Sequence, residues 1–170
     1  MKKILLLLAL ASVWTLQAET FIKVTDPATL QDGDQIVMGY EAKAHVSAGF
    51  SDTKKFIATA TATFAGDQLT LNEPTTITLK KNGSFWNLYI GSKPVGHASE
   101  SSDLDTKYRY TTDFIISIEN GNAKIVSQTP GKNSNEVFFA YNPSSPRFAL
   151  YHAGSNMKAI TLYRLDESTI

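Results

Sequence analysis

The sequence predicts an all-β protein, and three observations support this fold class. Apolar and polar residues alternate with a period of two in many segments of the chain. Asn-Gly pairs and other turn-forming residues separate these segments at short intervals. No long window has the 3.6-residue apolar spacing of an amphipathic helix. A chain with this pattern buries one face of each strand and builds its core from sheets.

The alternation is clearest in three segments, where every second side chain is apolar. These residues are Ile77 and Leu79, then Phe114, Ile116 and Ile118, then Phe148 and Leu150. The stretch FIATATATF, residues 56–64, places phenylalanine and alanine on one side and mainly threonine on the other. Threonine suits extended structure, so this stretch is predicted to form a single strand.

Turn residues stand between the predicted strands. Asn82-Gly83 separates TITLKK from SFWNLYI, and Asn120-Gly121 separates FIISIE from NAKIVS. Both pairs can supply the two positive φ angles of a type I′ turn, so two hairpins are predicted here. Asp26 followed by Pro27 predicts one short helical turn, with the aspartate as its N-cap.

The predicted strands recur in a similar order three times. The triplet Ile-Thr-Leu at residues 77–79 returns at 160–162. The three stretches run from GDQIVMGY to TTITLKK, from SFWNLYIG through SDLDTKYRY to TDFIISI, and from NAKIVSQT to KAITLYR. About 12 short strands in three pseudo-repeats predict a β-trefoil, a closed barrel capped by hairpins. A β-sandwich or an up-and-down barrel is the alternative, which would explain the alternation but not the triplication.

The N-terminus has the features of a cleaved export signal. MKKILLLLALASVWTLQA combines two lysines, an apolar run, and Leu16 and Ala18 at the positions that a signal peptidase reads. The apolar run is shorter than the roughly 20 residues that span a bilayer, and the chain has no cysteine for a lipid anchor. We therefore expect residues 1–18 to be a signal peptide. Residues 19–170 are expected to form a single all-β domain that is secreted, periplasmic or at the cell surface.

The charge balance argues against two classes of partner. Loss of the signal peptide removes Lys2 and Lys3, which leaves 14 basic against 16 acidic side chains and a net charge of −2. Nucleic acids and anionic membrane surfaces both attract concentrated basic patches. We therefore expect no nucleic-acid partner and no membrane insertion.

The chemistry-bearing residues do not form a recognisable catalytic motif. Without cysteine, the chain has no thiolate nucleophile and no thiolate metal site. His45, His97 and His152 lie in separate segments without metal-binding spacing. No Gly-x-Ser-x-Gly elbow occurs. We expect a protein that is not an enzyme, with no metal and no other cofactor.

Several segments together resemble a known module. They are FIKVTDPATLQDGDQIVMGY, FWNLYIG, GHASESSDL, TDFIISIENGNAKI, FFAYNPSSPRFALYH and KAITLYRL, which span residues 21–165. In this order they resemble a small all-β module of secreted and surface proteins of Gram-negative gut and oral bacteria. No catalytic activity is attached to that module, so the resemblance implies an accessory or binding role. The Gln-x-Trp repeat of ricin-type lectin trefoils is absent, so the sugar sites of those lectins are not transferred.

Two segments combine aromatic and polar side chains. Saccharide sites commonly pair an aromatic face, which stacks on the sugar ring, with polar groups that bind hydroxyls. In an alternative interpretation the tyrosines cap the barrel core with their hydroxyls at the rim. The candidate ligand-binding residues are Asp103, Asp105, Tyr108 and Tyr110 in the first segment, and Asn142, Arg147, Tyr151 and His152 in the second.

The sequence as a whole predicts a secreted, non-catalytic binding module. Its partner is expected to be an extracellular glycan or surface polymer, or an extracellular protein. Two alternatives stay open. An exposed loop could inhibit secreted proteases, since a rigid loop loses little entropy on binding, and the domain could be a structural or adhesive component of the cell surface.

Overall fold

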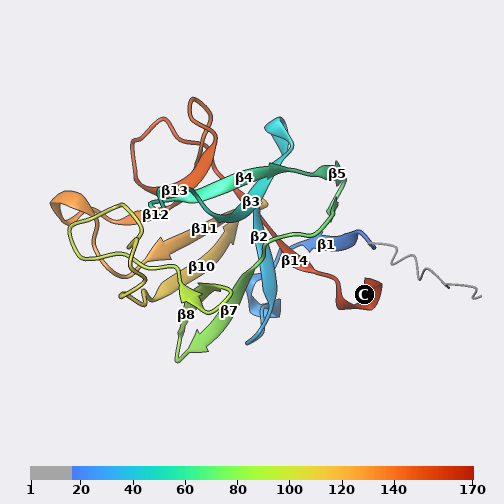
Figure 1. Ribbon diagram of the computed structural model, residues 1–170, viewed down its shortest axis with the longest axis horizontal. Helices are drawn as coiled ribbons and strands as arrows, with labels where there is room; N and C mark the ends of the chain where they lie inside the picture. The colour runs from blue at the N-terminus through green and yellow to red at the C-terminus, as the bar shows by residue number, and fades with distance from the viewer. Residues whose placement is uncertain (1–16) are drawn as a thin grey trace, which may run out of the picture.

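The computed structural model describes residues 17–170, so nearly all of the predicted signal peptide lies outside the described residues. The described part of the chain is all-β (Figure 1). Its strands are β1 (Glu19–Lys23), β2 (Gln35–Tyr40), β3 (His45–Phe50), β4 (Ile57–Thr61), β5 (Thr63–Ala65), β6 (Gln68–Leu71), β7 (Ile77–Asn82), β8 (Phe85–Ile90), β9 (Lys93–Pro94), β10 (Phe114–Glu119), β11 (Asn122–Ser127), β12 (Val137–Asn142), β13 (Arg147–His152) and β14 (Thr161–Leu165). The helical elements are single 3-10 turns: η1 (Pro27–Thr29), η2 (Glu41–Lys43), η3 (Lys132–Ser134) and η4 (Glu167–Thr169). Over residues 17–170, none of these helices has the length and apolar character to cross a bilayer.

Local chemistry explains the tight turns. Asn120 and Gly121 have φ angles of 51° and 79° and join β10 to β11, with Glu119 opposite Asn122. This confirms the predicted type I′ hairpin, because both turn residues have positive φ. In the other predicted hairpin the turn lies one residue later, at Gly83-Ser84, because Asn82 is still paired with Phe85 in the ladder. Asp26 caps η1 as expected, accepting the Ala28 N–H at 2.9 Å.

The strand pairings form a long antiparallel path. β2 pairs with β7, β7 with β8, β8 with β10, and β10 with β11. Ala123 of β11 bridges Ile160, the residue before β14, and β14 pairs with β2. β2 therefore lies between β7 and β14 in the sheet, and one isolated bridge links β11 to the residue before β14. The β3–β4 and β12–β13 hairpins pair with each other through Phe148 and Ile57.

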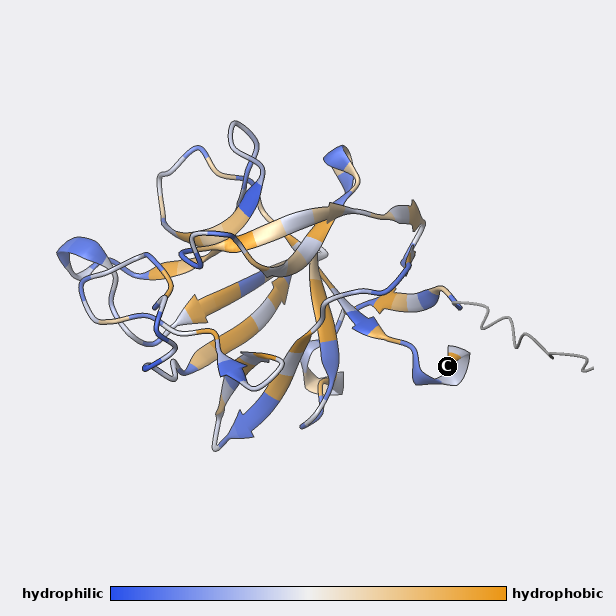
Figure 2. Ribbon diagram, viewed as in Figure 1, coloured by the Kyte–Doolittle hydropathy of each residue, from blue (hydrophilic) through white to orange (hydrophobic). Residues whose placement is uncertain are grey.

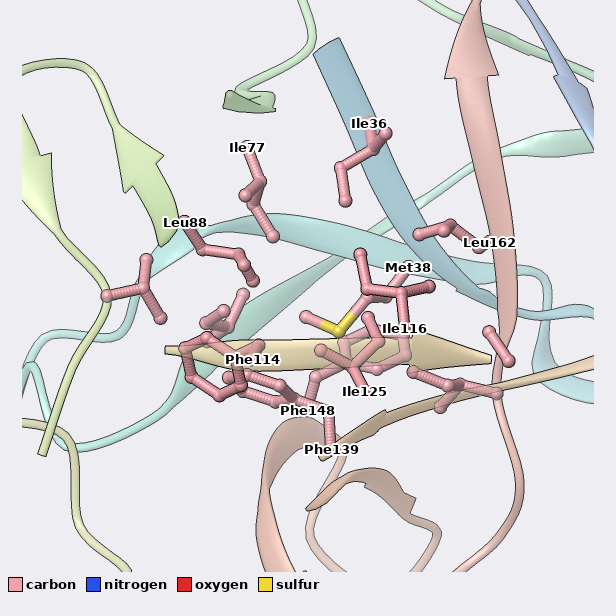
Figure 3. Packing of buried hydrophobic residues seen from close by; sticks show 14 of the residues in the cluster. Ile36, Met38, Ile77, Leu88, Phe114, Ile116, Ile125, Phe139, Phe148 and Leu162 are labelled. Atoms are coloured by element: carbon pink, nitrogen blue, oxygen red, sulfur yellow. The ribbon is translucent and has the colours of Figure 1, made fainter. Parts of the chain in front are cut away.

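The main core is built from six segments of this sheet: β2, β7, β8, β10, β11 and the stretch that leads into β14. Each of its six segments contributes two inward residues, i and i+2, to one buried cluster. The directly opposed pairs are Ile36 with Ile77, Trp86 with Phe114 and Ala123 with Ile160, then Met38 with Leu162, Leu79 with Leu88 and Ile116 with Ile125. Figure 3 shows side chains of this cluster converging from strands that surround them. Such burial supplies the main stabilising free energy of a chain that has no disulfides.

A smaller cluster lies on the other side of β2 and β14. β1 pairs with β14 and with β6, and β6 pairs with β5. Phe21, Leu69 and Tyr163 are buried between these strands. β2 therefore buries residues on both faces, with Met38 in the main cluster and Val37 in the smaller one. Figure 2 shows the hydrophobic residues concentrated in the strands and the hydrophilic ones in the loops.

Two predicted strands differ from the structure. The stretch 56–64 is not a single strand, because it breaks at Ala62, whose N–H donates to Ala44 O at 2.9 Å. After this break β5 pairs with β6 instead of continuing beside β3. SDLDTKYRY, residues 102–110, forms no strand at all and belongs to a long loop between β9 and β10. In Figure 1 this loop is the yellow-green segment at the left.

Candidate functional site

A cleft of about 360 Å³ brings the two predicted segments together. We call it the β13 cleft, because β13 supplies half of its lining residues. Asp103 from the first segment shares it with Arg147, Tyr151 and His152 from the second. Its lining residues are Lys55, Phe56, Ser102, Asp103, Lys132, Arg147, Ala149, Leu150, Tyr151 and His152.

The cleft exists because segments distant in the chain meet at one place. Phe148 of β13 pairs with Ile57 of β4, which places the residues before β4 beside β13. The long loop is attached to the same point, since Leu104 N–H donates to Lys55 O at 2.9 Å. Lys132 comes from η3, in the connection between β11 and β12.

Tyr151 is the best-positioned hydrogen-bonding group of the cleft. Its hydroxyl oxygen accepts from Asn142 Nδ2 and from Arg147 Nε, each at 3.1 Å. A tyrosine hydroxyl has two acceptor positions and one hydrogen. Because both acceptor positions are used, the hydroxyl hydrogen is left to donate. The half-buried Tyr151 is thus a fixed donor at the cleft.

Asn142 does not line the cleft but positions Tyr151 from behind. It is buried at the end of β12, with 8% of its surface exposed. Its Oδ1 accepts from Ser144 N–H at 3.0 Å and from Ser145 N–H at 3.1 Å, which closes the turn between β12 and β13. Its Nδ2 is used by Tyr151. All of its polar atoms therefore have partners within the protein, and it is a positioning residue.

Arg147 and Phe56 form a second fixed element of the cleft. The guanidinium carbon of Arg147 lies 4.6 Å from the centroid of the Phe56 ring, within the range of a cation–π contact. Ala149 and Leu150 also line the cleft but are largely buried, with 8% and 3% of their surface exposed. His152 is exposed, and its Nδ1 donates to Ala153 O at 2.7 Å, which leaves Nε2 for other partners. The cleft therefore combines apolar surface with several directed polar groups.

Two further candidate residues of the first segment, Asp105 and Tyr110, lie beside the β13 cleft. A shallower hollow of about 220 Å³ adjoins it through Lys55 and Asp103. Asp105, Arg109 and Tyr110 line this hollow. Tyr110 is 40% exposed, and Arg109 lies 5.2 Å from its ring centroid. These residues border the adjacent surface rather than the cleft.

Asp105 shapes the long loop. Its carboxylate accepts from Arg109 Nη2 at 2.9 Å, from Arg109 Nε and from the Arg109 backbone N–H. The Arg109 side chain is the main cause that lowers the pKa of Asp105 from 3.8 to about 2. Side-chain to backbone bonds of this kind compete with a strand ladder, which explains the missing strand. Because its charge is satisfied internally, Asp105 is not free to bind a ligand.

Tyr108 lies outside both hollows. Its ring centroid is 5.0 Å from that of Phe50. Lys93 Nζ lies 4.6 Å from the ring and Lys54 Nζ 5.8 Å from it. Its backbone has a φ angle of 56°, in the left-handed region that non-glycine residues rarely adopt. Tyr108 thus packs against Phe50 and two lysines within the loop and lines neither hollow.

The histidines lie in three different environments. His45 Nδ1 is 2.6 Å from Tyr141 Oη, and His97 is buried with Nε2 2.7 Å from Ser127 Oγ. Burial is the main cause that lowers the pKa of His97 below 6.5. His152 alone lines the cleft. Within residues 17–170, no three His, Cys, Asp or Glu residues come together in a way that could hold a metal ion.

A larger hollow of about 620 Å³ near the C-terminus is acidic, but three of its four carboxylates have internal roles. Asp32 accepts the Lys81 N–H at 2.7 Å, which ties the loop before β2 to β7. Asp34 lies 3.5 Å from Arg164. Asp166 accepts the Ser168 N–H as the N-cap of η4. These carboxylates cap turns and pair with arginine.

Lys55, Phe56 and Lys132 were missed by sequence reasoning. Phe56 was predicted to begin a strand, and no local pattern marks these three residues as site residues. Only the long-range pairing of β4 with β13 brings Lys55 and Phe56 to Arg147 and Tyr151.

Comparisons of the chain with family models, with curated proteins and with solved structures found no match.

Proposed function

We propose that this protein is an exported, non-catalytic binding module that holds an extracellular saccharide in the β13 cleft. The observation that carries this proposal is the geometry of Tyr151, whose hydroxyl is held as a donor by Asn142 and Arg147. Saccharides present hydroxyl acceptors next to apolar C–H faces, and the cleft offers this donor next to the half-buried Phe56. Its volume of about 360 Å³ lies within the range of small-ligand sites, about 300–1,000 Å³.

We further propose that the fold is a β-trefoil. In support, opposed core pairs recur with the same spacing in each predicted repeat. Ile36 and Met38, Trp86 and Leu88, and Ala123 and Ile125 belong to the first strands of the three repeats. Their partners come from the last strands, around residues 77–79, 114–116 and 160–162. The β13 cleft is lined by residues from all three predicted repeats.

A binding role explains the cleft better than hydrolysis does. Glycosidases commonly use two carboxylates on either side of the scissile bond. The cleft is lined by one carboxylate, Asp103, whose Oδ2 is 3.3 Å from Lys55 Nζ. Asp105, the nearest carboxylate in sequence, is held by Arg109 and lines the adjoining hollow. The carboxylates of Asp103 and Asp105 are therefore not arranged as an acid and nucleophile pair.

Protease inhibition is the second candidate, and the β12–β13 turn favours it. Ser144, Ser145 and Pro146 are exposed, and Asn142 Oδ1 holds the backbone of the two serines. A loop braced in this way loses little conformational entropy when it enters a protease cleft. A panel of secreted proteases assayed with the purified domain tests this candidate.

The saccharide proposal is tested on a glycan and polysaccharide array with residues 19–170. We expect selective binding that Tyr151→Phe weakens about tenfold, because this change removes the hydroxyl donor and keeps the ring. Tyr89→Phe is the matched control, since Tyr89 does not line the cleft. Absence of binding to every saccharide, together with inhibition of a protease, would replace the first candidate by the second.

A further inference from the structure

The β13 cleft carries an excess of positive charge. Lys55, Lys132 and Arg147 line it, against the single carboxylate of Asp103. Lys55 and Asp103 neutralise each other at 3.3 Å. Within residues 17–170, neither Lys132 nor Arg147 takes part in an ion pair. Two cationic side chains therefore border the cleft without a counter-charge, although the domain has a slightly negative net charge.

We infer that the saccharide of the β13 cleft is anionic and places a uronic carboxylate or a sulfate ester beside Lys132 and Arg147. This inference rests on the proposed function and adds the chemical class of the ligand. An arginine guanidinium presents its N–H groups in a planar fork that matches carboxylate and sulfate oxygens. Arg147 uses Nε for Tyr151, which leaves its two Nη groups for the anion.

The cleft holds Arg147 ready for such a ligand. The guanidinium lies over the Phe56 ring at 4.6 Å, and its Nε is bonded to Tyr151 at 3.1 Å. A charged side chain fixed from two sides loses less conformational entropy when it binds. The Tyr151 hydroxyl stands next to it as a neutral donor. An anionic group and a neighbouring sugar oxygen can therefore be bound together.

Asp103 has a separate role in this account. Its side chain is 62% exposed, and its carboxylate pairs with Lys55 at 3.3 Å. An incoming anion must compete with Asp103 for Lys55 and is repelled by the carboxylate. Asp103 therefore limits the affinity for anions, and its removal should strengthen binding. A purely structural role for these residues would not produce this gain.

The test is isothermal titration calorimetry of residues 19–170 with two matched ligand pairs at low ionic strength. Oligogalacturonate is compared with its fully methyl-esterified form, and dextran sulfate with neutral dextran. We expect the charged member of at least one pair to bind at least about tenfold more tightly, and the pair that responds identifies carboxylate or sulfate. Equal affinity within the pairs would overturn the anionic class and leave the saccharide proposal standing. If none of the four probes binds but a neutral sugar binds on the glycan array, the anionic class is also overturned and the saccharide proposal stands. No binding in either assay would remove both proposals.

Variants test which charged side chains determine the affinity for the charged probe. Lys132→Gln and Arg147→Gln should each weaken binding of the charged probe about tenfold. Asp103→Asn should strengthen it about threefold, because it frees Lys55 from an exposed ion pair. Lys43→Gln makes the same charge change on η2, outside the cleft lining, and should leave the affinity unchanged. Circular dichroism and thermal melting check that each variant is folded.

Two results would contradict the inference. If Lys43→Gln weakens binding as much as Lys132→Gln, the attraction is a diffuse property of the surface charge and not of the cleft. If Asp103→Asn weakens binding, the carboxylate contacts the ligand directly and the cleft selects for a different chemistry.

Discussion

Phe148 of β13 lies directly opposite Ile57 of β4 in an antiparallel pair, and both side chains are fully buried. This pair joins two hairpins that are far apart in the chain. It also places Lys55 and Phe56, which precede Ile57, beside the wall formed by β13. The packing of one apolar pair thus determines where the candidate site lies.

Phe148→Ala should both destabilise the domain and change the position of the residues that line the β13 cleft. Phe148 packs within the main cluster, with its ring centroid 5.3 Å from that of Tyr141. Removal of a buried phenylalanine side chain costs about 3–5 kcal/mol through lost transfer free energy and a residual cavity. Urea denaturation measures this change. Ile115→Ala, at a position 43% exposed on β10, is the control and should change the free energy of unfolding by less than about 1 kcal/mol.

Gly96→Ala should loosen the long loop between β9 and β10. A Cβ atom at Gly96 would lie 2.1 Å from the backbone oxygen of Tyr110, and backbone cannot move aside as a side-chain tip can. The loop must shift, at a cost of about 1–3 kcal/mol. We expect faster trypsin cleavage after Lys107 and Arg109. Gly154→Ala is strained by the φ of +83° at this position but has open space around its Cβ and lies outside the loop, so it should leave cleavage in the loop unchanged.

Arg109→Ala should raise the pKa of Asp105 from about 2 towards 3.8, because the Arg109 side chain is the largest cause of the shift. The folded pKa is depressed, so this interaction stabilises the protein above pH 3.8 and is lost as the pH falls towards 2. NMR titration of the Asp105 carboxyl carbon measures the pKa directly. An unchanged value in the variant would show that the backbone N–H groups alone hold the charge.

His97 should make the domain less stable in mild acid. Burial lowers the pKa of His97 below 6.5, and hydrogen bonds to Ser101 and Ala98 oppose this shift only in part. The unfolded chain therefore binds a proton at a higher pH than the folded protein does. The free energy of unfolding should fall as the pH drops below about 6.5 and level off below the folded pKa. His97→Gln should remove this slope, which urea denaturation at several pH values would show. An equal slope in the variant would assign it to other groups.

Local chemistry made part of the fold predictable. Asn120-Gly121 forms the expected hairpin because both residues tolerate positive φ, and this requirement does not depend on distant contacts. The alternation of Ile77 and Leu79 identified core positions, since a strand with one buried face must alternate. The all-β class followed from such segments.

The long loop was not predictable from the same pattern. Tyr108 and Tyr110 alternate with Lys107 and Arg109 as in a strand, but Asp105 captures the Arg109 backbone N–H and side chain instead. A carboxylate that replaces ladder hydrogen bonds leaves no trace in hydrophobic periodicity.

The candidate site was predictable only in part for a related reason. Arg147, Tyr151 and His152 lie close together on one strand, so the mixture of residue types drew attention to them. Lys55 and Lys132 reach the cleft through tertiary contacts and have no local signal. Asn142 was assigned to ligand contact, but its buried amide positions the Tyr151 hydroxyl.

The most direct test of the account is a ¹H–¹⁵N NMR titration of residues 19–170 with the saccharide that binds most tightly. We expect the largest shift changes at the backbone amides of Phe56, Asp103, Lys132 and Tyr151, which come from four separate segments around the β13 cleft. Changes confined to another face, such as the acidic hollow at Asp32 and Asp166, would contradict the assignment of this cleft as the binding site.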